Sequence, residues 1–110
     1  LVRHEFEYPI PVDDAEAMWQ LAPHRLEKTR WILDLPGGEW VVDCFAGENA
    51  PLVLAEVELP QIDQEVVIPP WCGPEITGDS RWSNAVLAQK PLQSWTLEER
   101  VRSSLAESLD

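Results

Sequence analysis

Three consecutive stretches rich in branched and aromatic residues, separated by two turn signals, constrain the fold of this chain most strongly. The stretches span residues 26–34, 39–45 and 52–60, and such runs are typical of β-strands. Pro36-Gly37-Gly38 separates the first two, and residues 47–51, which include Gly, Asn and Pro, separate the second from the third. Short connections of this composition join neighbouring antiparallel strands. The pattern therefore predicts a three-stranded antiparallel meander.

The third stretch carries two carboxylates on one predicted face. Glu56 and Glu58 are two residues apart, and Ala55, Val57 and Leu59 alternate with them. Because alternate strand residues point to opposite sides, both acids leave the sheet on the side away from the apolar residues. Paired acids on one face are compatible with a metal site, but an ordinary solvated strand face has the same pattern.

Asp43 is an acid within an otherwise apolar stretch, residues 40–45. A buried lone carboxylate is costly unless it meets a cation, a hydrogen-bond donor or a metal. Lys28 and Arg30 share one face of the preceding stretch and are the obvious partners. A structural ion pair and a role in a functional site both remain open.

Residues 2–8 predict a further strand. Arg3, Glu5 and Glu7 alternate with apolar and aromatic residues, and Pro9 ends the run, so one face of this strand would be fully charged. The alternative is an ordinary half-buried strand with its polar face in water.

All four predicted strands thus carry charged residues, and the set as a whole includes both signs. They are Arg3, Glu5, Glu7, Lys28, Arg30, Asp43, Glu56 and Glu58. If these faces converged on one cavity, the basic side chains would neutralise a polyanion such as a phosphate chain. The carboxylates would hold Mg²⁺ or Mn²⁺, which prefer oxygen ligands. Spacing alone does not distinguish convergence from charges that face the solvent.

Capping signals predict helices on either side of the meander. Asp13 and Glu16 form a capping box at the start of a helix over residues 13–22, whose apolar residues are expected to face the core. Residues 82–87 suit a helical turn packed on the sheet. A second capping box opens an amphipathic helix over residues 96–109.

Composition excludes several classes of function. The net charge of −12 argues against nucleic-acid partners and anionic membrane surfaces, which require basic proteins. No apolar run approaches the roughly 20 residues that span a bilayer. The two cysteines do not have the spacing of a zinc site, and we expect a cytoplasmic protein.

Five motifs, in order from about Val2 to Leu87, carry a resemblance to a known family. They are Arg3-x-Glu5-x-Glu7-Tyr8-x-Ile10-Pro11, Lys28-Thr29-Arg30-Trp31, Trp40-x-x-Asp43-x-Phe45-x-Gly47-x-Asn49, Ala55-Glu56-Val57-Glu58-Leu59-Pro60 and Thr77-Gly78-Asp79-x-Arg81-Trp82-x-Asn84. Together they resemble the later portion of a CYTH domain, of the triphosphate tunnel metalloenzyme superfamily.

This resemblance implies a fold and a division of roles. The fold would be α+β, with the antiparallel sheet forming part of an eight-stranded tunnel that binds a triphosphate, and with flanking helices. Arg3, Lys28 and Arg30 would bind the phosphates. Asp43, Glu56 and Glu58 would hold Mg²⁺ or Mn²⁺, and Glu5 and Glu7 would be catalytic, as further metal ligands or by orienting the attacking water.

The sequence departs from the family at its start. The family's opening Glu-x-Glu-x-Lys signature is absent, and so are the Arg-x-Arg pair and the lysine expected before Arg3. The chain would therefore be the C-terminal part of a longer protein, or a half-domain that closes the tunnel as a homodimer about a two-fold axis. We accordingly expect residues 1–95 to form the C-terminal portion of a CYTH-like tunnel domain and residues 96–110 a terminal helix.

The expected function is metal-dependent hydrolysis of a triphosphate, either tripolyphosphate or a nucleoside triphosphate. Two alternatives follow from the same residues. One is an adenylate cyclase of class IV on the same scaffold. The other is a non-catalytic module that binds polyphosphate or nucleotides, which the incomplete set of basic residues would favour.

Overall fold

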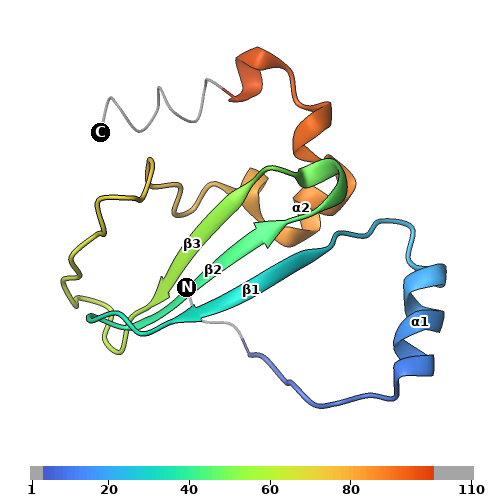
Figure 1. Cartoon of the computed structure of the whole chain (residues 1–110), viewed down its shortest axis with the longest axis horizontal. Coiled ribbons are helices and arrows are strands. Elements are labelled where there is room, and N and C mark those ends of the chain that lie inside the picture. Colours follow the sequence, from blue (N-terminus) through green and yellow to red (C-terminus); the bar gives the residue numbers. More distant parts are fainter. Residues whose placement is uncertain (1–3, 101–110) are drawn as a thin grey trace.

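The computed structural model describes residues 4–100 and contains one three-stranded sheet. Strands β1 (Lys28–Leu33), β2 (Glu39–Phe45) and β3 (Val53–Glu58) pair antiparallel in the order β1-β2-β3 (Figure 1). The predicted meander and the α+β class are confirmed. No helix in the described part of the chain is long and apolar enough to cross a membrane.

The register of the strands determines which side chains share a face. Arg30 lies opposite Asp43, and Glu56 lies opposite Val41. Residues directly opposite each other in an antiparallel pair point to the same side of the sheet. One side, which we call the charged face, therefore carries Lys28, Arg30, Ile32, Glu39, Val41, Asp43, Phe45, Leu54, Glu56 and Glu58.

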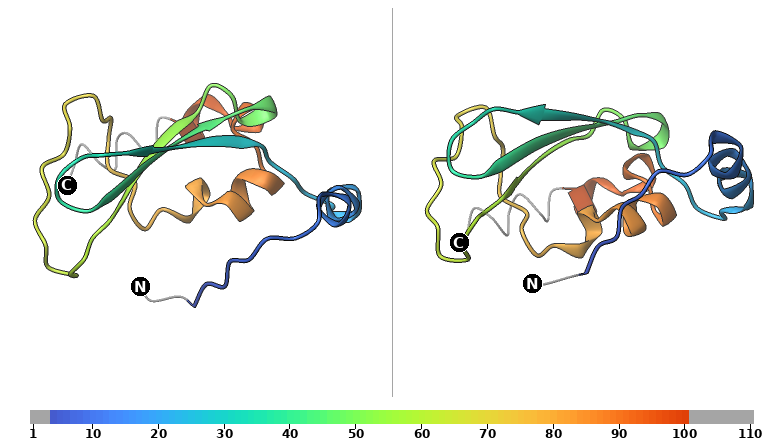
Figure 2. Two further views of the ribbon diagram at one scale, coloured as in Figure 1. Left: turned by 60° about the horizontal axis from the view of Figure 1, so that its bottom comes forward. Right: turned by 90° about the horizontal axis from the view of Figure 1, so that it is seen from below.

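Short helices cover one end of the charged face. They are η1 (Gly47–Asn49), η2 (Ser80–Trp82), α2 (Asn84–Gln89) and η3 (Leu92–Ser94). Both views in Figure 2 place α2 on one side of the sheet. The buried core lies between these layers and consists of Phe45, Leu87, Leu92 and Trp95, so the prediction of a helical turn at residues 82–87 packed on the sheet is confirmed.

Asn49 connects three of these helices through its buried side chain. Its Nδ2 atom donates to the carbonyl oxygen of Leu87 at 3.2 Å, and its Oδ1 atom accepts from the N–H of Leu92 at 2.9 Å. Both backbone groups lie in the core region, where an unpaired polar group is costly. One side chain therefore holds η1, α2 and η3 in place over the charged face.

The segment before the sheet differs from the prediction. Residues 4–8 form no strand, and Phe6 and Tyr8 are exposed. The segment is extended and runs on the side of the sheet that carries α2 (Figure 2). Alternation produces a strand only where a neighbouring strand accepts the backbone hydrogen bonds, and no described segment pairs with residues 4–8. Arg3 lies outside the described residues.

Helix α1 (Val12–Leu21) is present, but two of its predicted features are wrong. Pro11 occupies the N-cap position instead of Asp13, and no side chain caps the helix. No residue of α1 is buried: Met18 is 61% exposed and Trp19 is 38% exposed. The helix stands apart from the sheet (Figure 1), so its apolar side chains find no core to pack against.

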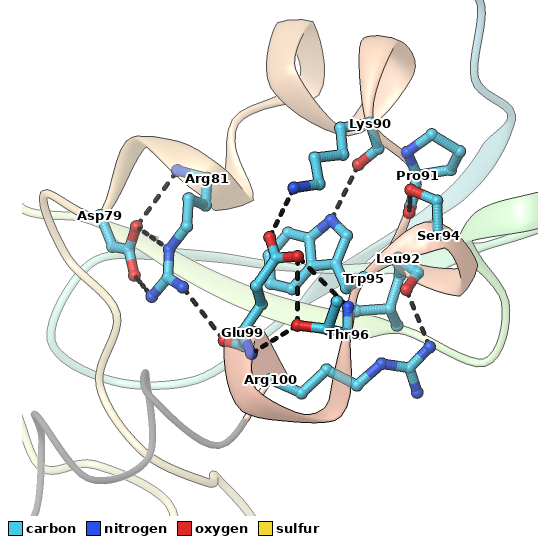
Figure 3. A network of polar contacts seen from close by, with 10 residues as sticks. All are labelled: Asp79, Arg81, Lys90, Pro91, Leu92, Ser94, Trp95, Thr96, Glu99 and Arg100. Atoms are coloured by element: carbon cyan, nitrogen blue, oxygen red, sulfur yellow. Dashed lines mark hydrogen bonds and ion pairs between the residues drawn. The ribbon is translucent and has the colours of Figure 1, made fainter.

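The second predicted capping box is confirmed. Thr96 Oγ1 accepts from the N–H of Glu99 at 3.1 Å, and Glu99 Oε1 accepts from the N–H of Thr96 at 3.3 Å. Glu99 also pairs with Lys90 at 2.6 Å, and its carbonyl oxygen accepts from Arg81 (Figure 3). The helix that follows is described through residue 100, and the rest of the predicted terminal helix lies outside the described residues.

We predict that Asn49→Ala destabilises the protein by about 1–3 kcal/mol, because it leaves two buried backbone groups without a partner. Urea unfolding followed by tryptophan fluorescence measures the change. Glu48→Ala, at the exposed neighbouring position, is the control and should shift stability by less than about 0.5 kcal/mol. Equal effects of the two variants would contradict the role assigned to Asn49.

Candidate functional site

Three charged side chains meet in the middle of the charged face. Asp43 has only 2% of its side chain exposed. Lys28 Nζ lies 2.7 Å from its Oδ2 atom, while Arg30 donates from Nε to Oδ1 at 2.8 Å and from Nη2 to Oδ2 at 2.9 Å. The ion pair that the sequence left open is therefore present, and it involves both predicted cations.

These contacts shift the pKa values of Asp43 and Arg30. The hydrogen bonds from Arg30, and then those from Lys28, hold the pKa of Asp43 below its ordinary value of 3.8, against the opposing effect of burial. Asp43 in turn raises the pKa of Arg30, chiefly through the hydrogen bonds, and the nearby charges of Glu56 and Glu7 raise it further. The carboxylate of Asp43 and the guanidinium of Arg30 are thus both charged at neutral pH.

Both cations keep hydrogen-bond donors for a further anion. A lysine ammonium has three N–H groups and a guanidinium has five. Lys28 donates to Asp43 and, at 3.4 Å, to Asn84, while Arg30 uses its Nε and Nη2 atoms on Asp43. The side chain of Lys28 is 18% exposed and that of Arg30 is 47% exposed. The remaining N–H groups of both side chains are not used by any of these contacts among residues 4–100, so they are available to a ligand that approaches from the solvent.

An acidic end of the charged face lies beyond this cluster. Glu56 and Glu58 share this face, as predicted from their spacing, and both are exposed. The register adds Glu39, which is directly opposite Glu58 and is also exposed. Sequence reasoning missed Glu39, because its place follows from the pairing across the Pro36–Gly38 turn. Like charges directly opposite each other are unfavourable unless solvent or a cation separates them.

The fit to Mg²⁺ or Mn²⁺ differs among the predicted ligands. Glu56 and Glu58 offer the carboxylate oxygens that these cations prefer. Asp43 has both oxygens engaged by Lys28 and Arg30 and would have to exchange one of them for a metal. Between residues 4 and 100, no group of three or more His, Cys, Asp or Glu side chains is placed to hold a metal ion. The metal roles remain predictions.

The two predicted catalytic acids lie on the extended segment that runs on the side of the sheet that carries α2 (Figure 2). Glu5 and Glu7 are exposed, and Glu7 is near enough to Arg30 for its charge to affect the pKa of the guanidinium. Glu7 is thus associated with the charged face although its segment forms no strand. The predicted phosphate ligand Arg3 lies outside the described residues.

Proteins named inorganic triphosphatase resemble this chain over most of its length. The chain is 39% identical over 95 residues to one from Acetivibrio thermocellus, covering 84% of the chain and 61% of the relative. It is 42% identical over 92 residues to one from Nitrosomonas europaea, covering 80% of the chain and 61% of the relative. The chain thus spans less than two thirds of either relative. No protein-family model and no solved structure matches it.

We predict that Asp43→Asn destabilises the protein at pH 7 by about 1–3 kcal/mol, because the amide cannot pair with two cations. Since the folded-state pKa of Asp43 lies below 3.8, its contribution is full above that value. The contribution is lost as the pH falls through the folded-state pKa, so the difference from wild type should shrink as the pH falls below about 4.

Urea unfolding of both proteins over this pH range measures the difference. Asp34→Asn, at an exposed position just after β1, is the control for general charge effects. A difference that grows as the pH falls would contradict the assigned ion pairs.

Proposed function

We propose that this chain forms part of a CYTH-type triphosphate tunnel metalloenzyme that hydrolyses inorganic tripolyphosphate. The observation that carries the proposal is the cluster of Lys28 and Arg30 on Asp43, in the middle of the charged face. The identity to two proteins named inorganic triphosphatase, 39% and 42%, supports the choice of substrate. The predicted site residues on the described strands share this face.

The charged face supplies the interactions that a phosphate chain requires. Arg30 would grip two phosphate oxygens with its remaining N–H groups, because the guanidinium plane matches such a pair of acceptors. Lys28 would bind a neighbouring phosphate as a point charge. Asp43 holds both cations in fixed positions beforehand, which reduces the reorganisation needed when the substrate binds.

Glu56 and Glu58 would hold Mg²⁺ or Mn²⁺ at the acidic end of the face. The chemistry that a metal held there would supply is stabilisation of the charge that develops during phosphoryl transfer. Glu7, with Glu5, would orient the water that attacks in line with the leaving phosphate. The effect of the Glu7 charge on the pKa of Arg30 supports this assignment, because the water must lie on the same side as the phosphates that Arg30 would bind.

Closure of a tunnel around the charged face belongs to the same proposal. The three-stranded sheet would form one wall, and the extended segment of residues 4–10, which runs on the side of the sheet that carries α2, would contribute to another (Figure 2). The remaining wall would come from further strands of a longer chain or from a second copy of this one.

A second candidate is a module that binds polyphosphate without turnover. It is favoured by the engagement of both Asp43 oxygens and by the absence, within residues 4–100, of a group of three side chains placed to hold a metal. The two candidates share the phosphate-binding cations and differ in whether Glu56 and Glu58 support catalysis.

We predict that the protein releases phosphate from tripolyphosphate in the presence of Mg²⁺ or Mn²⁺. Glu56→Gln should lower the rate at least about 100-fold, because it removes a charged oxygen ligand of the metal. Glu65→Gln, an exposed change of the same kind on the loop after β3, is the matched control and should retain activity. Binding of tripolyphosphate without phosphate release would identify the non-catalytic module, and cyclic AMP formation from ATP would identify a cyclase.

A further inference from the structure

The motif Thr77–Asn84 is held in place by a turn, a helix cap and an ion pair. Gly78 has a φ of +82°, which reverses the chain before η2. Asp79 then caps η2 by accepting from the N–H of Arg81 at 3.1 Å, and its carboxylate also pairs with the Arg81 guanidinium at 2.7 Å. Figure 3 shows Arg81 between Asp79 and Glu99. The motif is therefore tied to the capping box of the following helix.

The start of α2 is held equally firmly. Ser83 is its N-cap and accepts from the N–H of Val86 at 3.3 Å. Leu87 is completely buried in the core on the same helix. The first residue of α2, Asn84, is thus fixed at its backbone by a cap on one side and by core packing on the other.

Asn84 reaches the charged face from this position. Its Oδ1 atom accepts from Lys28 Nζ at 3.4 Å, across 56 residues of sequence. The same ammonium lies 2.7 Å from Asp43 and 5.7 Å from the centre of the Phe45 ring. A contact to Asp43 alone would set a distance for the flexible lysine side chain, whereas a second acceptor on another element also sets its direction.

The Asn84 side chain is uncharged, and this bears on its role beside Lys28. A second carboxylate would bind the ammonium more strongly, but it would cancel the positive charge that a phosphate needs. An amide oxygen steers the ammonium and leaves its charge available. If the contact served stability alone, an acid would be the better residue at position 84, because an acid at the N-terminus of a helix and beside a lysine is stabilising.

We propose that Asn84 is a positioning residue that aims the Lys28 ammonium at the phosphate chain of the substrate. This inference rests on the proposed function. It gives the last of the five motifs a role at the site, although Asn84 lies on the helical layer and not on the sheet. The short helices that cover one end of the charged face would thus also set the direction of one phosphate-binding donor.

The test is the affinity for tripolyphosphate, measured by isothermal titration calorimetry on the wild-type chain and its variants. Asn84→Asp should weaken binding about 10-fold or more, because a second carboxylate neutralises Lys28. Asn84→Ala should weaken it about 3-fold, through lost orientation alone. Gln89→Glu makes the same change of charge at an exposed position at the far end of α2, and should change affinity less than about 2-fold.

A background variant separates positioning from general electrostatics. With Lys28→Met, the further change Asn84→Asp should have no larger effect than Gln89→Glu, because its target is gone. The melting temperature of Asn84→Asp should be at least that of wild type, which excludes unfolding as the cause of weaker binding. Equal losses with and without Lys28, or equal affinities of Asn84→Asp and Gln89→Glu, would overturn the inference alone. No binding by the wild-type chain would contradict the proposed function, and this inference with it.

Discussion

The buried carboxylate of Asp43 is the constraint on which the charged face depends. A carboxylate that is 2% exposed must keep its cations, because an unpaired buried charge is far costlier than the pair. Its partners Lys28 and Arg30 come from the neighbouring strand. A slip of one residue between β1 and β2 would move these groups to opposite faces. The ion pairs therefore select the register, and the register in turn assembles the face.

The charged face has two ends of different character. At one end the short helices cover Phe45 and enclose Lys28, and Asn49 and the Thr96–Glu99 capping box hold these helices in place. At the other end Glu56 and Glu58 are exposed. A basic region beside an acidic one suits a phosphate chain with a bound metal ion: the basic region would bind the phosphates, and the acidic region would bind the metal. The proposed function uses this separation.

Local sequence patterns predict the sheet and its faces well, because the side-chain period of two depends only on extended backbone. The shared face of Lys28 and Arg30 follows from spacing alone. Glu39 does not, since its place opposite Glu58 depends on the register across a turn. Neither the missing strand at residues 4–8 nor the exposed face of α1 follows from local pattern, because both depend on which other segments are available for pairing and packing.

The most direct measurement of the central claim is a titration of the ¹⁵N-labelled chain with tripolyphosphate, followed by NMR of the arginine side chains. The Nε–H signal of Arg30 should shift and saturate, because that guanidinium lies on the charged face beside Lys28. Arg25, which stacks on Trp19 with its guanidinium carbon 5.1 Å from the ring centre, should not shift and serves as the internal reference. Saturating shifts at Arg25 with none at Arg30 would contradict the assignment of the charged face as the phosphate-binding surface.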